Sequence, residues 1–353
     1  MRNQKRKMNF GDAPYKDIRY GNYTDQYFNY TNVILEANRR YSEVIMQVFN
    51  KVGGIVCGLD ESIMILKNCI KDLDAPVEIH ALYDGDTFSP FETVMTIKGQ
   101  LHNFTHLETI ILGIIARGTK VATNTNNVVS AANGKNVLFF PARFDRYENQ
   151  RSDGYAALIG GASNVSTPQQ SIAWEGGPTG TMPHALIAAY EGNTALATFK
   201  YAKTVPNNKI ISLVDFENDC CKTAVETAQF LMESGFKLDG VRLDTSGTMV
   251  DASVVPMMTN FKPTGVCPQL VLNVRNALDN HGFPDVKIYV SGGFNPEKIA
   301  QFEHLKLPVD GYGVGSSMYN GNYDFTADVV VVNGNRCAKV GRHYNSNPRL
   351  ELV

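Results

Sequence analysis

The chain has 353 residues, of which 43% are hydrophobic and 19% are charged, and its formal net charge is −2. Such a length is enough for one large or two medium domains with a substantial core. A charge so close to zero does not suggest a nucleic-acid partner. The basic residues 2–7 have no apolar segment after them, so they do not form a secretory signal, and no apolar run approaches the roughly 20 residues that span a membrane.

The cysteines indicate a cytoplasmic protein without a zinc site. They are scattered and include no CxxC pair or Cys/His cluster of the kind that binds zinc. Reduced thiols in this arrangement are typical of the cytoplasm. The cysteines are Cys57, Cys69, Cys220, Cys221, Cys267 and Cys337.

The first part of the chain predicts a small domain of mixed helices and strands. Residues 1–22 are polar and are expected to form an extended arm, after which Thr24 or Asp25 can cap a helix that runs toward Arg39. A further helix is expected through residues 63–69. Strands are expected at residues 44–49, 53–57, 78–82 and 93–97, with a turn at 83–86.

From about Phe104 onward, short apolar runs alternate with helical patterns. Helices are expected at residues 107–116 and 223–232, among strand-like runs at 137–140, 172–174, 210–214, 236–244, 286–290 and 309–315. This repetition predicts an α/β fold, either an α/β barrel or an open sheet. We therefore place a smaller N-terminal α/β domain at residues 1–105 and a barrel domain at 106–328. Residues 329–353, with a strand-like run at 329–332, are expected to pack back on the first domain.

Three of the strand-like runs end in residues that suit a phosphate group. The glycines among them let an anion approach the backbone, and a helix start at Asn295-Pro296 adds free N–H groups that attract anions. Single glycine pairs are usually plain turn residues, but their recurrence at late strand ends favours a phosphate site. The residues are Arg242 and Asp244 in the first run, Ser291, Gly292 and Gly293 after the second, and Gly313, Gly315 and Ser316 at the end of the third.

Polar residues in the middle of the chain are further candidates for ligand binding. Arg143 and Arg146 have the planar fork that binds phosphate or carboxylate, although a surface ion pair is the ordinary alternative. Ser163 and Asn164 lie in a small, polar segment that either contacts a ligand or forms a turn.

One histidine and one aspartate are candidates for phosphate chemistry. His184 lies in the glycine-rich residues 176–184, beside expected strand ends, whereas a single histidine is more often structural. Asp215 follows the strand-like run 210–214, where a carboxylate could hold Mg²⁺ beside phosphates or cap the next helix.

Several motifs, in their common order, resemble the nicotinate phosphoribosyltransferase family, in its short archaeal-like form within the type II phosphoribosyltransferases. The resemblance covers nearly the whole chain, from Thr24 to Val353. The motifs that carry it are Thr24-Asp25-Gln26-Tyr27-Phe28 with Thr31, residues 91–99 with Phe104 and Leu107-Glu108-Thr109, Gly180-Thr181-Met182-Pro183-His184, residues 241–246, Ser291-Gly292-Gly293, residues 313–316, and the closing residues 338–342 and 347–351.

The resemblance implies a two-domain enzyme of NAD biosynthesis or salvage. It implies a small N-terminal domain and an α/β barrel, in a homodimer or higher oligomer whose subunits share active sites. The reaction joins nicotinate to phosphoribosyl pyrophosphate (PRPP), giving nicotinate mononucleotide and pyrophosphate. The family couples this transfer to ATP hydrolysis through a phosphorylated histidine, with Mg²⁺ on the pyrophosphate. No nucleic acid, membrane or zinc takes part.

The resemblance also implies a role for each matching position. His184 matches the phosphorylated histidine, and Arg242 and Asp244 act with it at the reacting centre. The absence of an aspartate near Ser163 favours an acid over an amide substrate, because a buried carboxylate repels nicotinate. The nicotinate pocket includes Tyr27 of a neighbouring subunit, Phe140, Arg143, Ser163, Asn164 and Thr181; the phosphate site includes Ser291, Gly292, Gly293, Gly313, Gly315 and Ser316; and Asp215 helps to hold Mg²⁺.

The sequence departs from the family at two places and leaves other functions open. Phe140-Pro141-Ala142 replaces the usual start of the FGxR motif before Arg143, and the cysteine cluster of some archaeal members is absent. The alternatives are a quinolinate or nicotinamide phosphoribosyltransferase, an inert sensor of PRPP or NAD precursors, and a generic phosphate-binding barrel isomerase.

Overall fold

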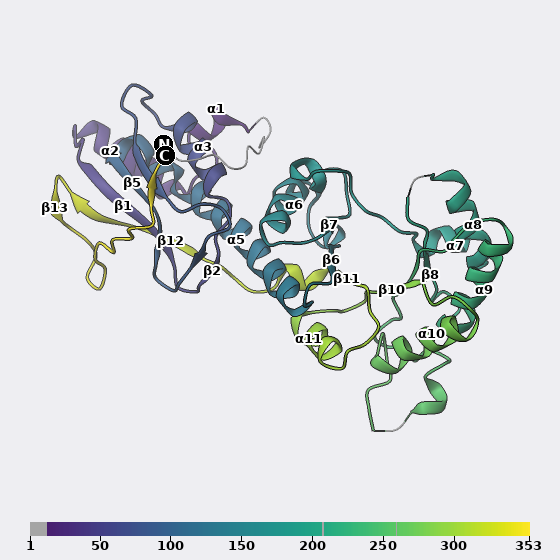
Figure 1. Ribbon diagram of the computed structural model, residues 1–353. Helices are drawn as coiled ribbons and strands as arrows, with labels where there is room; N and C mark the ends of the chain where they lie inside the picture. Colours follow the sequence, from purple (N-terminus) through teal and green to yellow (C-terminus); the bar gives the residue numbers. More distant parts are fainter. Residues whose placement is uncertain (1–12, 207, 259) are drawn as a thin grey trace.

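The structure, a computed structural model, describes residues 13–206, 208–258 and 260–353. Within that part, the chain forms two lobes (Figure 1). The first 12 residues of the arm predicted at 1–22 lie outside the described residues. The remainder is not extended, because helix α1 (Tyr15–Arg19) forms there and buries Ile18 in the first lobe.

The N-terminal lobe is built on an antiparallel sheet with the strand order β13-β12-β1-β5-β3-β14. Strand β12 runs beside β1, from the pair Val44 and Val332 to the pair Asn50 and Phe325, and β14 pairs with β3. The end of the chain therefore completes this sheet. The strands are β1 (Glu43–Asn50), β3 (Glu78–Ala81), β5 (Thr93–Gln100), β12 (Phe325–Val332), β13 (Asn335–Arg336) and β14 (Glu351–Leu352), with a separate pair β2 (Gly54–Ile55) and β4 (Thr87–Phe88).

Helices cover this sheet and close its core. The apolar sides of α3 (Leu59–Cys69) and of the first half of α5 (Glu108–Ala131) pack with the buried side chains of β1 and β5, as expected for amphipathic helices on a sheet. The helices and short 3-10 turns of the lobe are α1, α2 (Gln26–Ala37), α3 (Leu59–Cys69), α4 (Leu101–Phe104) and η1 (Thr105–Leu107).

Helix α5 (Glu108–Ala131) is much longer than the helix predicted at 107–116, and it belongs to both lobes. Ile111 and Ile115 lie in the N-terminal core, whereas Val121 and Val128 lie in the barrel core. The second half escaped prediction because its buried positions include threonines. The hydroxyls of Thr123 and Thr119 accept hydrogen bonds from the Ile55 and Cys57 N–H groups at 3.0 and 3.2 Å, in and just after β2.

The second lobe is an α/β barrel, as predicted. Its parallel strands are hydrogen-bonded in the order β7-β6-β11-β10-β9-β8. In the described part of the chain, β7 and β8 are not paired with each other, so the sheet is a half-barrel with these two strands at its edges. The strands are β6 (Asn136–Phe139), β7 (Asn164–Val165), β8 (Ile211–Leu213), β9 (Gly240–Leu243), β10 (Lys287–Val290) and β11 (Gly311–Val314).

Helices and short 3-10 turns connect the strands and cover the outside of the barrel (Figure 1). Most of their apolar residues form one core with the strands, and Met182, Ile187, Ala197 and Leu213 form a smaller, separate cluster. The connecting segments are η2 (Ala142–Phe144), η3 (Tyr147–Asn149), α6 (Gln150–Ile159), η4 (Gln170–Ala173), α7 (His184–Ala189), α8 (Thr194–Thr204), α9 (Cys220–Glu233), η5 (Val255–Met257), α10 (Pro268–Asn280), α11 (Pro296–His304) and η6 (Ser316–Tyr319).

The strand predicted at residues 172–174 is wrong, because the chain forms η4 there. The hydroxyl of Thr167 accepts a hydrogen bond from the Gln170 N–H at 3.2 Å and starts the turn. Trp174 then donates from its indole N–H to the Gly154 carbonyl at 3.0 Å. The apolar residues of this segment thus pack against α6 without joining the sheet.

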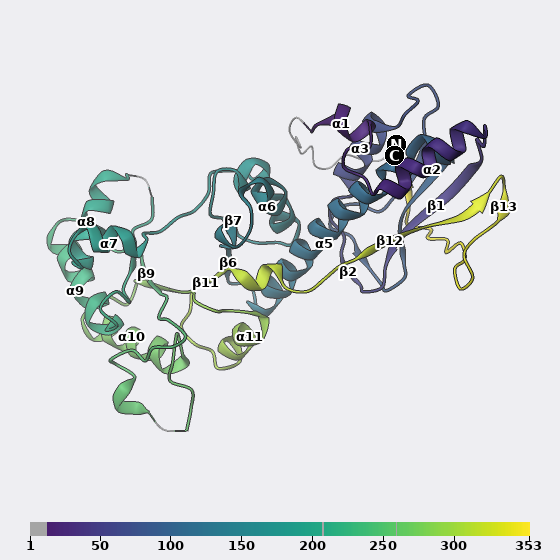
Figure 2. The ribbon, with the colours of Figure 1, turned by 180° about the vertical axis from the view of Figure 1, so that it is seen from behind.

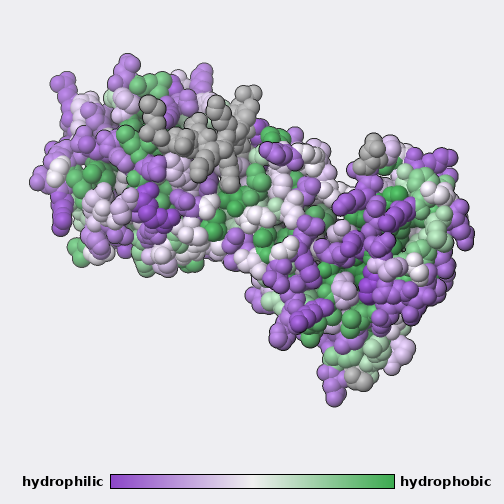
Figure 3. All heavy atoms as spheres, viewed as in Figure 1, coloured by the Kyte–Doolittle hydropathy of each residue, from purple (hydrophilic) through white to green (hydrophobic). Residues whose placement is uncertain are grey.

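The chain crosses between the lobes twice, once through α5 and once through the segment that leads from η6 to β12, as both ribbon views show (Figure 2). The space-filling view shows hydrophilic side chains over most of the face seen there, with hydrophobic patches between them (Figure 3). No helix in the described ranges is long and apolar enough to pass through a membrane. All six cysteines are free thiols.

Candidate active site

A pocket of about 470 Å³ lies at the carboxyl ends of the barrel strands. The loops after β6, β9, β10 and β11 contribute to it, together with the segment that leads into α7. Most of the residues predicted for the site meet here: Phe140, Arg143, Thr181, His184, Arg242, Asp244, Ser291, Gly292, Gly293, Gly313, Gly315 and Ser316.

The backbone after β10 forms a cradle for an anion. Gly292 and Gly293 have φ angles of +85° and +71°, which only glycine adopts without strain. Within the described chain, their N–H groups donate no hydrogen bond to another residue. Asn295 caps α11, accepting a hydrogen bond from the Lys298 N–H at 2.8 Å, so the positive end of that helix dipole lies next to the cradle.

The loop after β11 supplies the opposite side of the cradle. A Cβ atom at Gly315 would lie 2.7 Å from Phe144 Cε2, and one at Gly313 would lie 2.9 Å from the Phe140 ring. Gly313 at the end of β11 and Gly315 after it therefore let this segment pack closely against Phe140 and Phe144. The N–H of Ser316 begins η6 and donates to no other group of the described chain.

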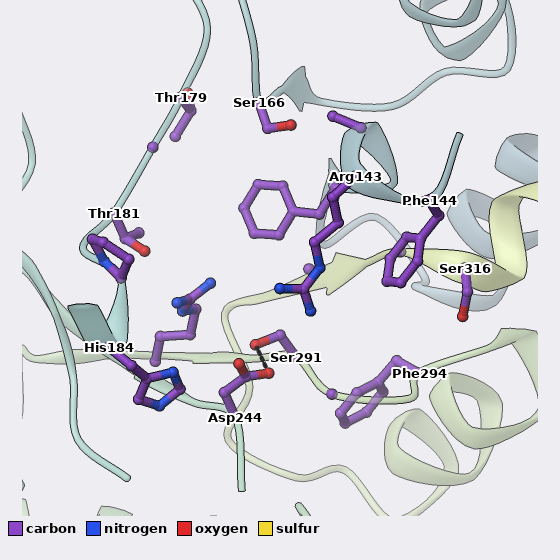
Figure 4. A pocket seen from close by; sticks show the side chains of 18 of the residues that line it. Arg143, Phe144, Ser166, Thr179, Thr181, His184, Asp244, Ser291, Phe294 and Ser316 are labelled. Carbon is purple, nitrogen blue, oxygen red and sulfur yellow. Dashed lines mark hydrogen bonds between the residues drawn. The ribbon is translucent and has the colours of Figure 1, made fainter. Parts of the chain in front are cut away.

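Asp244 and Arg242 place opposite charges at the end of β9. The Asp244 carboxylate accepts a hydrogen bond from Ser291 Oγ at 2.7 Å, which fixes it beside the glycine cradle (Figure 4). Arg242 donates to the Met182 carbonyl at 3.3 Å, and its Nε is buried with no partner in the described chain. Burial lowers the pKa of the Arg242 guanidinium, and Asp244 and Asp215 oppose that effect.

His184 and Asp215 form a polar pair at the edge of the pocket. The His184 Nε2 lies 3.0 Å from Asp215 Oδ1, and the imidazole side chain is 48% exposed whereas the carboxylate is 7% exposed. Burial raises the pKa of the Asp215 carboxyl, while the neighbouring His184 lowers it. The carboxylate thus orients one ring nitrogen, and the other has no hydrogen-bond partner among the described residues.

Arg143 enters the pocket from η2, and its guanidinium points toward Ser291 and Asp244 (Figure 4). The guanidinium carbon lies 5.3 Å from the centre of the Phe144 ring. Arginine above an aromatic wall suits a flat ligand that carries a carboxylate. The exposed Arg146 pairs with Glu148 at 2.7 Å and does not line the pocket.

Some predicted residues lie outside the pocket lining, and the pocket also has lining residues that the sequence did not predict. Ser163 does not line the pocket; it precedes β7, where its Oγ accepts a hydrogen bond from the Val137 N–H at 3.0 Å. Asn164 is also outside, and its side chain donates to Thr179, which does line the pocket. The lining residues that were not predicted are Ala142, Phe144, Ser166, Thr179, Gly180, Met182, Pro183 and Phe294. No local signal distinguishes Ser166 from Ser163, since only the position of β7 places Ser166 at the pocket.

Tyr27 and Asp215 also lie away from the pocket lining. Tyr27 is on α2, in the N-terminal lobe, with 59% of its surface exposed, and Figure 1 shows that helix far from the barrel strands of the same chain. Asp215 reaches the pocket only through His184. Among the described residues, no group of three or more histidine, cysteine or acidic side chains could hold a metal ion by itself.

An α/β barrel with a glycine-lined anion cradle at its strand ends, joined to a separate antiparallel sheet, defines the class of a barrel-type phosphoribosyltransferase. The family described as "Quinolinate phosphoribosyl transferase, N-terminal domain" matches residues 25–119. Nicotinate-nucleotide pyrophosphorylase from Pyrococcus furiosus superposes with a TM-score of 0.81 at 30% identity, over 98% of this chain and 86% of that one. The chain belongs to the type II phosphoribosyltransferase family.

Curated relatives carry a more specific name. Nicotinate phosphoribosyltransferase pncB2 of Mycobacterium tuberculosis is 26% identical over 246 residues, which cover 68% of this chain and 48% of the relative. The nicotinate phosphoribosyltransferase of Bacillus subtilis is 24% identical over 242 residues. The chain spans about half the length of these curated relatives. Human nicotinic acid phosphoribosyltransferase, at 15% identity and a TM-score of 0.65 over 89% of this chain and 75% of that one, shares the fold.

Proposed function

We propose that the protein is a nicotinate phosphoribosyltransferase, which transfers the phosphoribosyl group of PRPP to nicotinate in NAD biosynthesis or salvage. The observation that carries this proposal is that one pocket contains both a phosphate cradle at Gly292 and Gly293 and an arginine, Arg143, over an aromatic wall. The curated nicotinate phosphoribosyltransferases among the relatives support it.

Each end of the pocket has a distinct task in the transfer. The N–H groups of Gly292, Gly293 and Gly315 bind the 5′-phosphate, and Asp244 binds the ribose hydroxyls. Arg143 binds the carboxylate of nicotinate and so directs the pyridine nitrogen toward C1′ of the ribose. The C1′–O bond breaks and the oxygen keeps its electron pair on pyrophosphate, while the nitrogen lone pair forms the new C1′–N bond. Arg242 stabilises the negative charge of the phosphates.

We assign ATP coupling to His184. With Nε2 held by Asp215, the Nδ1 lone pair is available to accept a phosphoryl group from ATP. The exposure of the imidazole gives a nucleotide access to it. The phosphate on the histidine then adds negative charge that organises nearby cations before PRPP binds.

Mg²⁺ fits this site as a companion of the pyrophosphate group. Mg²⁺ binds to one or two carboxylates together with substrate phosphates, and Asp215 and Asp244 are the carboxylates near the pocket. The ion would supply charge neutralisation for the leaving pyrophosphate. Asp215 is also the hydrogen-bond partner of His184, so a metal-binding role for Asp215 stays a prediction.

We also propose that a second subunit completes the pocket. Tyr27, Tyr30, Val33 and Ile34 of α2 are each at least 59% exposed, which is unusual for large apolar residues on one helix. A neighbouring chain that brings Tyr27 over the pocket would cover this helix and stack an aromatic ring on the pyridine.

Quinolinate is the second candidate substrate, and the matching N-terminal family favours it. A second carboxylate requires further cations. The cationic side chains among the described residues that line the pocket are Arg143 and Arg242, and Arg242 is already held by the Met182 carbonyl. This charge favours the monocarboxylate.

The test is an assay of the purified protein with PRPP and Mg²⁺, with nicotinate, nicotinamide or quinolinate, and with or without ATP. We expect nicotinate mononucleotide as the main product and stimulation by ATP. Faster turnover of quinolinate than of nicotinate would overturn the proposal in favour of the second candidate.

A further inference from the structure

Arg117, which does not line the pocket, contacts two of its loops from behind. We call residues 140–145 the Arg143 loop and residues 315–319 the phosphate loop. Arg117 extends from α5, and its Nη1 donates to the carboxylate of Asp145 at the end of the Arg143 loop. Its Nε and Nη2 donate to the two oxygens of Asp153 at 2.9 and 2.7 Å.

Asp153 connects Arg117 to the phosphate loop. Its side chain is only 1% exposed, and its Oδ2 also accepts a hydrogen bond from the Tyr319 hydroxyl at 2.6 Å. The Arg117 guanidinium lies 4.7 Å from the centre of the Tyr319 ring, so the same arginine also contacts Tyr319 directly. Tyr319 ends η6, which begins at the phosphate-binding residue Ser316.

The two loops also meet inside the pocket, where a Cβ at Gly315 would lie 2.7 Å from Phe144. They are therefore joined at two points, by close packing in front and by the Arg117 network behind. A guanidinium has its donors in a fixed plane, so bonds to two carboxylates define the positions of both partners. The hydrogen bonds to Asp153 and Asp145 raise the pKa of Arg117 against the effect of its burial, so the group stays charged.

We propose that Arg117 is a positioning residue that sets the spacing between the carboxylate-binding end and the phosphate-binding end of the pocket. This inference rests on the proposed function. The hydrogen bond from Arg117 to Asp145, which we call the Asp145 arm, fixes the position of Arg143 two residues earlier in the chain. The contact from Arg117 through Asp153 to Tyr319, which we call the Tyr319 arm, fixes the N–H groups of the phosphate loop. The spacing decides whether the pyridine nitrogen reaches C1′ when both ligands are bound.

The two arms can be broken separately. Asp145→Asn weakens the arm to the Arg143 loop and keeps the buried Arg117–Asp153 pair. Tyr319→Phe removes the hydroxyl of the other arm and keeps the ring. Arg117→Met removes the bonds to Asp145 and Asp153 and the contact with the Tyr319 ring, so that the Tyr319–Asp153 hydrogen bond is no longer tied to the Arg143 loop. Arg146→Ala is the matched control, because Arg146 is an exposed arginine near the Arg143 loop whose side chain pairs with Glu148 in the described chain.

The first measurement is hydrogen–deuterium exchange of the ligand-free protein. We expect faster exchange of residues 140–146 in Asp145→Asn, of residues 315–320 in Tyr319→Phe, and of both segments in Arg117→Met. Arg146→Ala should match the wild type. A uniform increase over the whole barrel in every variant, or no increase in either segment, would overturn the inference.

The second measurement is steady-state kinetics with nicotinate and PRPP. Loss of a charge-assisted hydrogen bond should raise KM for nicotinate about tenfold in Asp145→Asn, with KM for PRPP unchanged. Tyr319→Phe should show the reverse, and Arg117→Met should lower kcat as well. If the wild type makes no nicotinate mononucleotide but the exchange pattern holds, the proposed function fails and the positioning role stands. If the wild type is active but neither pattern appears, only the positioning role fails.

Discussion

Gly292 offers a sharp test of the phosphate cradle, because its backbone conformation and its neighbours are both restrictive. At φ +85°, an alanine would be strained, and its Cβ would lie 3.2 Å from Asp244 Oδ1. Left-handed conformation costs a non-glycine residue about 1–2 kcal/mol, which corresponds to a factor of about 5 to 30 in an equilibrium constant. Relief of that strain would move the N–H away from the phosphate. Gly292→Ala should therefore weaken PRPP binding about tenfold, because the backbone strain and the displaced N–H both weaken the contact with the 5′-phosphate.

The matched control is Gly282→Ala, at the turn after α10. Gly282 has φ +84°, and a Cβ there meets nothing within 4 Å. Both variants carry similar backbone strain, but only Gly292 lines the pocket. Calorimetric titration with PRPP and thermal unfolding separate the two effects. Both variants should lose stability, whereas only Gly292→Ala should lose affinity. Equal affinity of Gly292→Ala and the wild type for PRPP would refute the cradle.

Four further predictions concern the substrate, ATP, assembly and pH. Arg143→Ala should lower kcat/KM for nicotinate at least about tenfold and leave the slow reaction of nicotinamide unchanged; equal losses for both would contradict carboxylate recognition. His184→Ala should lose ATP hydrolysis and its stimulation but keep slow transfer, measured as paired ADP and nicotinate mononucleotide formation; hydrolysis that persists in step with product would refute the role. When inactive Tyr27→Ala and Asp244→Ala proteins are mixed and exchange subunits, part of the activity should return. No recovery despite demonstrated exchange would contradict a shared site. Burial, together with the nearby Asp328 and Asp25, raises the pKa of Glu108 to about 7. The folded protein therefore binds this proton more tightly than the unfolded chain does, so the free energy of unfolding should fall as the pH rises from about 4.5 to 7. Chemical unfolding of Glu108→Gln at the same pH values should not show that fall.

The strand ends of the barrel could be predicted because each carries its own local signal. The apolar runs before Asp244, Ser291 and Gly313 are short and bounded by glycine, and the carboxyl ends of parallel strands necessarily share one edge. The meeting of these residues in one pocket follows from the parallel arrangement alone. The sequence therefore predicted that Arg242, Asp244 and the glycines at the ends of β10 and β11 lie together at one pocket.

The other half depends on information that is not local. Ser163 and Ser166 look alike in sequence, and only the position of β7 decides that Ser166 faces the pocket. Phe144 and Phe294 resemble ordinary core residues, although they form pocket walls. The Arg117 network joins residues from four segments, and no spacing in the sequence reveals it.

The most direct test of the central claim is a crystal structure of the protein with nicotinate mononucleotide. The account predicts that the 5′-phosphate accepts hydrogen bonds from the N–H groups of Gly292 and Gly293, and that the carboxylate of the pyridine pairs with Arg143. A nucleotide bound with its carboxylate away from Arg143, or with its phosphate outside the glycine cradle, would contradict the account.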